Sequence, residues 1–183
     1  MKKICLLLVL GVLMLGQSFG IDFSVLTGGW NNEGRIGINL FKLINVNVGV
    51  NYSAYDYSYT YSGSSYAYSV EYAYVFYGAK VLLPLSLAKR INLYAGVDMY
   101  TYNPRVLNHG TYYDPYYDSL KIEGMRYYIN CEYYPDEDKS FAFTGSYGID
   151  IMTYNYTGSS AYGYTSTSTN KNTFAQIGFI YYL

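Results

Sequence analysis

Apolar and polar residues alternate along most of this sequence, and the clearest alternation lies in its last eleven residues, 173–183. One set of alternate positions there is wholly apolar, whereas the other set is mixed and includes a glycine. A period of two places successive side chains on opposite faces of a β-strand, so the segment predicts a strand with one apolar face. The apolar positions are Ala175, Ile177, Phe179, Tyr181 and Leu183.

The same alternation recurs in seven earlier segments, so the sequence predicts eight strands in total. A terminal strand with an apolar face needs a partner for its edge, and a closed barrel supplies one. Tilted segments of roughly ten residues also fit the apolar layer of a membrane. The seven earlier segments are Ile21–Thr27, Arg35–Phe41, Ile44–Tyr52, Ala73–Leu83, Ile91–Tyr100, Gly124–Tyr133 and Phe141–Ile151.

Longer and shorter connections alternate between these segments. An even-numbered antiparallel meander with long loops at one end and short turns at the other is the pattern of a transmembrane β-barrel. The sequence therefore predicts an all-β protein, an eight-stranded antiparallel up-and-down transmembrane β-barrel. The expected turns are Lys42–Leu43, Pro84–Arg90 and Pro135–Lys139, and the expected loops are Gly28–Gly34, Asn103–Ser119 and Gly158–Asn172. Tyr55–Tyr74 is expected to form a hairpin with its tip at Ser62–Ser65 between tyrosine-alternating arms.

Residues 1–20 have the three parts of a secretory signal peptide. Lys2 and Lys3 form the charged start, residues 4–15 are apolar, and small residues precede a cleavage point after Gly20. A transmembrane helix needs about twenty apolar residues, which this stretch does not supply. We expect a signal peptide over 1–20 and a barrel domain over 21–183.

Two kinds of eight-stranded barrel fit the alternation, and they differ in which face of the strands points outward. A secreted lipocalin turns its apolar face inward around a ligand, and Gly28-Gly29-Trp30 resembles the lipocalin G-x-W motif. A membrane barrel turns the apolar face toward lipid. The opposite face is too poor in charge for a water-exposed surface but suits a small barrel interior, which favours the membrane barrel. Its polar residues include Asp22, Arg35, Asn39, Lys80, Asp98, Arg126, Glu132 and Asp150.

On this pattern, the chain from Ile21 to Leu183 resembles the small eight-stranded outer-membrane barrels of the OmpA/OmpX type, within the porin-like superfamily. Its last strand resembles the C-terminal insertion signal of that family, although the chain ends in Leu183 where the family usually has an aromatic residue. The resemblance implies the outer membrane of a two-membrane bacterium, with both termini periplasmic. The implied partners are outer-membrane lipid and the outer-membrane assembly machinery.

Tyrosine dominates the composition, with 28 of 183 residues, which agrees with an all-β chain. There are 12 Lys and Arg against 13 Asp and Glu and no basic patch, so we expect no nucleic acid partner. Outside residues 1–20 the only cysteine is Cys131, on the face expected to meet lipid. The sequence has neither a Cys/His metal cluster nor a Gly-rich phosphate loop, so we expect no cofactor and no metal.

Three inward positions suggest a cluster of ion pairs in the barrel interior. Asp98, Arg126 and Asp150 share the polar face, and Arg126 and Asp150 are expected on paired strands about one diagonal step apart. Opposite charges buried in a narrow lumen neutralise one another, so the cluster is expected to plug the barrel.

The tyrosine-rich connections are the best candidates for interaction with other molecules. Tyrosine offers a large amphipathic contact area at low entropic cost, although the same residues also suit an aromatic belt at the membrane surface. The candidate residues are Tyr57, Tyr59, Tyr61, Tyr66, Tyr68, Tyr112, Tyr113, Tyr116 and Tyr117.

These features favour a structural or adhesion-like surface-interaction role, in which the barrel is not an enzyme. A narrow passive pore is the first alternative, because eight strands leave little room for a channel. A lipid A-modifying enzyme is a third hypothesis, since His109 lies in a long loop with Asp114, Asp118 and Ser119. Sequence alone does not give the geometry by which a catalytic triad is recognised.

Overall fold

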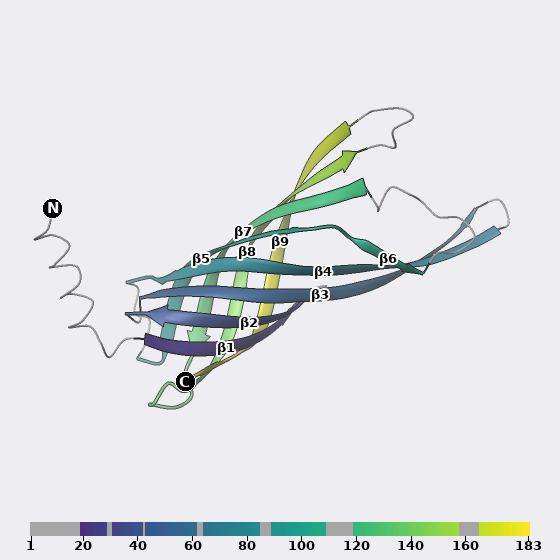
Figure 1. The fold of residues 1–183 in the computed structure, drawn as a ribbon. Helices are drawn as coiled ribbons and strands as arrows, with labels where there is room; N and C mark the ends of the chain where they lie inside the picture. The colour runs from purple at the N-terminus through teal and green to yellow at the C-terminus, as the bar shows by residue number, and fades with distance from the viewer. Residues whose placement is uncertain are drawn as a thin grey trace, which may run out of the picture.

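The computed structural model describes residues 19–28, 31–41, 43–61, 64–84, 89–108, 119–157 and 165–183. Within these ranges the chain forms one antiparallel sheet, and no helix there is long and apolar enough to cross a membrane. The strands are β1 (Phe19–Gly28), β2 (Asn31–Leu40), β3 (Ile44–Tyr61), β4 (Ser64–Leu82), β5 (Ile91–Tyr102), β6 (Arg105–Asn108), β7 (Leu120–Tyr133), β8 (Phe141–Thr157) and β9 (Thr165–Tyr182), as Figure 1 shows.

Eight of these strands close into a barrel, as the sequence predicted. Consecutive strands pair with each other, and β1 pairs back with β9, while the short β6 only extends the wall beside β4. Following the paired residues once around the barrel from Asp22 leads to Asn172 on β9, although Asp22 itself pairs with Tyr182. This stagger of ten residues tilts every strand against the barrel axis.

The two ends of the barrel differ in how far the strands extend beyond the wall. At the end that holds Phe19 and Leu183, which we call the terminal end, the connections are residues 41–43, 83–90 and 134–140. At the opposite end, the loop end, β3–β4 and β7–β8–β9 continue as two separate sheets beyond the shorter β1 and β2 (Figure 1). Features that project from the barrel therefore belong to the loop end.

Two of the expected loops are wrong in large part. β1 and β2 stay paired up to Gly28 and Asn31, so only residues 29–30 separate them, instead of the loop Gly28–Gly34. β9 begins at Thr165, inside the expected loop Gly158–Asn172. Both segments resemble loops because they are polar at nearly every position, and polar residues are tolerated on both faces where a strand meets the lumen or lies beyond the apolar surface.

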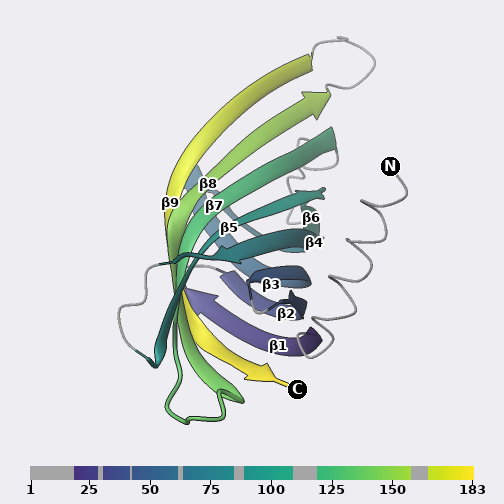
Figure 2. The ribbon, with the colours of Figure 1, turned by 90° about the vertical axis from the view of Figure 1, so that its left-hand side faces the viewer.

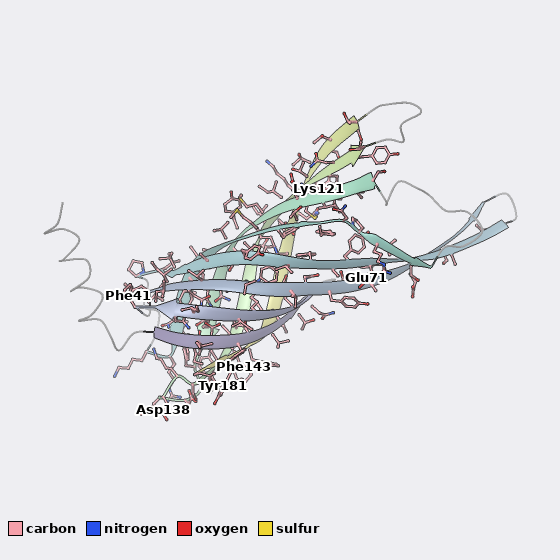
Figure 3. All side chains as sticks on the ribbon, viewed as in Figure 1. Phe41, Glu71, Lys121, Asp138, Phe143 and Tyr181 are labelled. Carbon is pink, nitrogen blue, oxygen red and sulfur yellow. The ribbon has the colours of Figure 1, made fainter. Side chains whose placement is uncertain are left out.

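The two faces of the barrel have the polarity that was predicted. Apolar side chains cover the outside: Val25, Ile36, Val48, Ile129 and Ile149 are each 42–55% exposed. Figure 3 shows Phe143 and Tyr181, both also outward and exposed, near the terminal end. The inner face instead buries Asp, Glu, Lys, Arg and Asn side chains. This arrangement contradicts the lipocalin-like alternative, which requires the apolar face inside.

Large aromatic rings fill the lumen by lying over glycines of the neighbouring strand. Tyr100 is paired with Gly124, and a Cβ atom added to Gly124 would lie 2.0 Å from the Tyr100 Cζ atom. Tyr128 covers Gly96 in the same way, and Phe76 covers Gly49. The inward glycines therefore make room for aromatic side chains, which fill the interior of an eight-stranded barrel.

Candidate functional site

The lumen is crossed by a buried chain of ion pairs. Arg126 on β7 pairs with Glu33 on β2, on the opposite wall of the barrel, and both side chains are fully buried. Arg35 Nη2 lies 2.6 Å from Glu33 Oε2 and 3.0 Å from Asp98 Oδ2. We call these four residues, Glu33, Arg35, Asp98 and Arg126, the central ion cluster. Two arginines alternate with two carboxylates in it, so the charges balance.

Aromatic rings enclose this cluster. The Arg35 guanidinium carbon lies 4.5 Å from the ring centroid of Phe76, and the Arg126 guanidinium carbon lies 5.2 Å from the same centroid. The Tyr128 hydroxyl donates a hydrogen bond of 3.1 Å to Asp98 Oδ1. Cation–π contacts and hydrogen bonds compensate part of the cost of burying charge. The cluster therefore closes the lumen with a tightly packed layer.

The predicted trio of Asp98, Arg126 and Asp150 lies in one row, but its ion pairs differ from the prediction. Arg126 is directly opposite both carboxylates on the paired strands, not one diagonal step away. Asp150 accepts a hydrogen bond of 2.6 Å from the Tyr100 hydroxyl. Among the described ion pairs, Arg126 is joined to Glu33. Glu33 was missed because it was assigned to a loop, although it alternates with the inward Arg35.

A second polar layer, the terminal-end network, lies in the lumen closer to the terminal end. Lys80 on β4 forms a buried ion pair with Glu132 on β7. The hydroxyls of Tyr134 and Tyr182 also donate to Glu132 Oε2, at 2.5 and 2.7 Å. Tyr134 follows the end of β7, and burial raises the pKa of its hydroxyl above the usual value, which keeps this donor protonated. Tyr134 also packs with Ala142 and Ile180 as a small apolar cluster.

A small polar cavity lies between the two layers. Its volume is about 20 Å³, and Arg35 and Lys80 both line it. The side-chain oxygens of Asn47 and Asn130, which also line it, have no hydrogen-bond partner in the described part of the chain. A cavity of this size with free acceptors has room for about one water molecule. The described lumen is therefore closed by side chains on both sides of this cavity.

The remaining predicted residues are only partly described. Tyr57 is paired with Tyr68 and Tyr59 with Tyr66 along the β3–β4 hairpin, and Tyr61 is paired with Ser64. The expected hairpin tip is thereby shortened, because Ser64 and Ser65 are strand residues. Cys131 is exposed on the outer face, as expected. Outside the described residues lie His109, Asp114, Asp118, Tyr112, Tyr113, Tyr116 and Tyr117.

The apolar outer surface has the extent and polarity of a surface that faces lipid. Soluble proteins rarely expose contiguous apolar patches of more than a few hundred Å². Here outward apolar side chains occur on all eight strands of the barrel, β1–β5 and β7–β9, and therefore surround it. The fold and this surface together define a membrane β-barrel with a polar, side-chain-filled lumen.

Three solved structures of outer-membrane proteins are similar to this chain. A major outer membrane protein from Thermus thermophilus is 14% identical, with a TM-score of 0.48, over 90% of this chain and 99% of that chain. CarO2 from Acinetobacter baumannii is 12% identical, with a TM-score of 0.43, over 91% of this chain and 100% of that chain. CarO from Acinetobacter baumannii is 12% identical, with a TM-score of 0.41, over 91% of this chain and 98% of that chain. No protein-family model and no curated protein sequence matches the chain.

A charge placed on the outer surface tests the lipid-facing assignment. Val48→Arg is expected to lower the free energy of unfolding by about 2–4 kcal/mol, since an arginine near the middle of the apolar layer must be desolvated. Urea unfolding in phospholipid vesicles measures this change. Ser58→Arg is the matched control on the outer face of the same strand, beyond the apolar residues, and is expected to be nearly neutral. Equal stability of both variants would contradict a lipid-facing surface at Val48.

Proposed function

We propose that this chain is an outer-membrane β-barrel whose closed body holds the β3–β4 hairpin outside the cell as an interaction surface. The supporting observation is the length of this hairpin. β3 and β4 are paired without interruption from Ile44 and Val81 to Tyr61 and Ser64. β2 leaves β3 at Tyr52, so the hairpin continues well beyond the barrel wall on that side.

The composition of the projecting hairpin suits contact with other molecules. Residues 53–72 alternate tyrosine with serine, threonine and alanine, and carry only Asp56 and Glu71 as charges. Tyrosine-rich surfaces with small polar neighbours are typical of protein-binding loops. A hairpin whose backbone is already paired also loses little conformational entropy when it binds.

The filled lumen supports a platform role over a passive pore. A continuous water path would have to pass both the central ion cluster and the terminal-end network. Breaking either one exposes a buried charge, which is costly. We therefore propose that the interaction surface lies at the loop end. Both termini are then periplasmic, and the resemblance to the OmpA/OmpX type stays a prediction.

Shortening the hairpin tests this proposal. The variant replaces residues 56–69 by Asn-Gly, which forms the tight turn that suits a two-residue hairpin and leaves Tyr55 paired with Val70. Cells of a two-membrane bacterium that express the full chain are expected to attach several-fold more than empty-vector cells to surfaces coated with mucin or collagen. Cells with the shortened variant are expected to lose this gain.

A second variant tests the tyrosine side chains separately from the length of the hairpin. It keeps the hairpin length and replaces Tyr57, Tyr59, Tyr61, Tyr66 and Tyr68 by threonine, which also favours strands. We expect the same loss of attachment. Heat-dependent gel mobility of both variants must match the full chain, which shows that the barrel still forms. Attachment that survives the shortening would overturn the proposed function.

A further inference from the structure

The half of β9 that lies at the loop end has an open edge. The pairing of β1 with β9 ends at Thr27 and Ile177, whereas the pairing of β8 with β9 continues to Thr157 and Thr165. Residues 165–173 of β9 therefore have β8 on one side and no described strand on the other. In Figure 2 this part of β9 is the outer strand of the β7–β8–β9 sheet.

The hydrogen bonds of β9 show which residues direct their backbone to this open edge. Leu183 N donates to Ile21 O at 2.8 Å, toward β1, whereas Tyr182 N donates to Ser140 O at 2.8 Å, toward β8. Backbone groups alternate sides along a strand, and the register of β8 with β9 runs without a shift up to Thr165. The residues that direct N–H and C=O groups to the open edge are thus Thr165, Thr167, Thr169, Lys171 and Thr173.

Apart from Lys171, this edge lacks the usual protection against pairing. Native edge strands are blocked by charged side chains, especially lysine, by proline, by bulges or by short length. Residues 165–173 are all exposed and paired in regular register with β8, and they contain no proline. Lys171 is their only charged residue. An edge of this kind readily accepts another strand.

We propose that the open edge of β9 pairs in antiparallel fashion with the same edge of a second copy of this chain. A twofold axis at Thr169 places Thr167 opposite Lys171 of the partner and Thr165 opposite Thr173. No like charges face each other in this register, and Thr–Thr pairs across strands are favourable. The residues that pair in this register are the ones that direct their backbone groups to the edge.

The tilt of the strands decides where the second copy lies, and this step rests on the proposed outer-membrane location. Strands of membrane barrels tilt by roughly 35–45° from the membrane normal. In two barrels of one membrane, related by a twofold along that normal, the β9 strands would cross steeply instead of running antiparallel. Barrels in facing membranes can align them, because their twofold lies in the plane between the membranes. The pairing therefore joins two membranes.

Cysteine cross-linking in phospholipid vesicles tests the register. In a Cys131→Ser background, Thr169→Cys places two thiols on the twofold, in a hydrogen-bonded pair with Cα atoms about 5.5 Å apart, which suits a disulfide. Oxidation by oxygen with a copper catalyst is expected to give mostly covalent dimer. Thr167→Cys in the same background is the control, since it faces Lys171, and is expected to stay monomeric. Equal yields from both variants, or none from either, would overturn the proposed register.

Vesicle clustering, followed by light scattering, tests whether the edge joins membranes. Vesicles carrying the full chain are expected to cluster, and Thr169→Pro and Thr169→Lys are expected to abolish this. The proline removes an N–H group that points to the open edge, so the β8–β9 pairing is retained. Thr157→Lys, exposed on the neighbouring β8, is the control and should cluster normally. Clustering that persists in both edge variants, or is absent from the full chain, overturns the inference, whereas the hairpin variants test the proposed function independently.

Discussion

Glu33→Gln is expected to lower the free energy of unfolding of the barrel by about 3–5 kcal/mol. The change keeps the size of the side chain but removes the charge that lies between Arg35 and Arg126. Arg35 retains Asp98 as a partner, whereas Arg126, which is fully buried, loses the one ion pair described for it. Urea unfolding in detergent micelles, followed by the heat-dependent shift in gel mobility, measures the loss.

Arg126→Met, the matching change on the other side of the lumen, should lower the free energy of unfolding less than Glu33→Gln does. Arg126→Met removes a cation but leaves Glu33 paired with Arg35. Replacing a whole buried ion pair by neutral groups is often nearly neutral, whereas breaking it is costly. The double variant Glu33→Gln with Arg126→Met is therefore expected to be more stable than Glu33→Gln alone. Strictly additive losses would show that the two residues are not coupled.

An exposed ion pair supplies the control for this series. Lys121 and Glu123 are 2.7 Å apart, with side chains 52% and 49% exposed. Exposed pairs contribute roughly 0–1 kcal/mol, so Lys121→Ala should leave the unfolding curve almost unchanged. If Lys121→Ala destabilised the barrel as much as Glu33→Gln does, burial would not be the cause of the effect.

Alternation predicted the faces of the barrel well because it is a local property. Val46, Val48 and Val50 alternate with Asn45, Asn47 and Gly49, and the structure places the first set outside and the second set inside. The same alternation also predicted which segments form strands near the terminal end. A closed barrel puts every apolar set on one surface and gives the terminal strand a partner for its edge, which is why the barrel was predictable.

The partners inside the lumen were not predictable in the same way. Lys80 and Glu132 were both expected to face inward, but their ion pair joins β4 and β7, which are not adjacent. Such contacts depend on the stagger between the strands, which alternation does not determine. Glu33 shows a second limit, since a strand segment that is polar on both faces cannot be distinguished from a loop by its polarity.

Gly178→Ala is expected to prevent or strongly weaken closure of the barrel, at a cost of about 3 kcal/mol or more. Gly178 lies opposite Leu26 in the ladder that joins β9 to β1. An added Cβ atom would lie 2.0 Å from the Val25 carbonyl oxygen and 2.9 Å from Leu26 Cα. Both are backbone atoms, so no side chain can move aside. The measurement is the fraction of refolded protein that shows heat-dependent gel mobility.

Gly145→Ala is the matched control, because Gly145 is paired with Ile177, the residue next to Gly178. The nearest atom to a Cβ added there is the Gln176 carbonyl oxygen at 3.8 Å, an ordinary contact. Where the backbone accepts alanine without strain, such a change stabilises a protein by about 0.4–1 kcal/mol through the unfolded chain. Normal folding of Gly145→Ala together with failure of Gly178→Ala would locate the constraint at the β1–β9 ladder. Normal folding of both variants would mean that this ladder can shift apart, and closure would then depend on the remaining β1–β9 pairs.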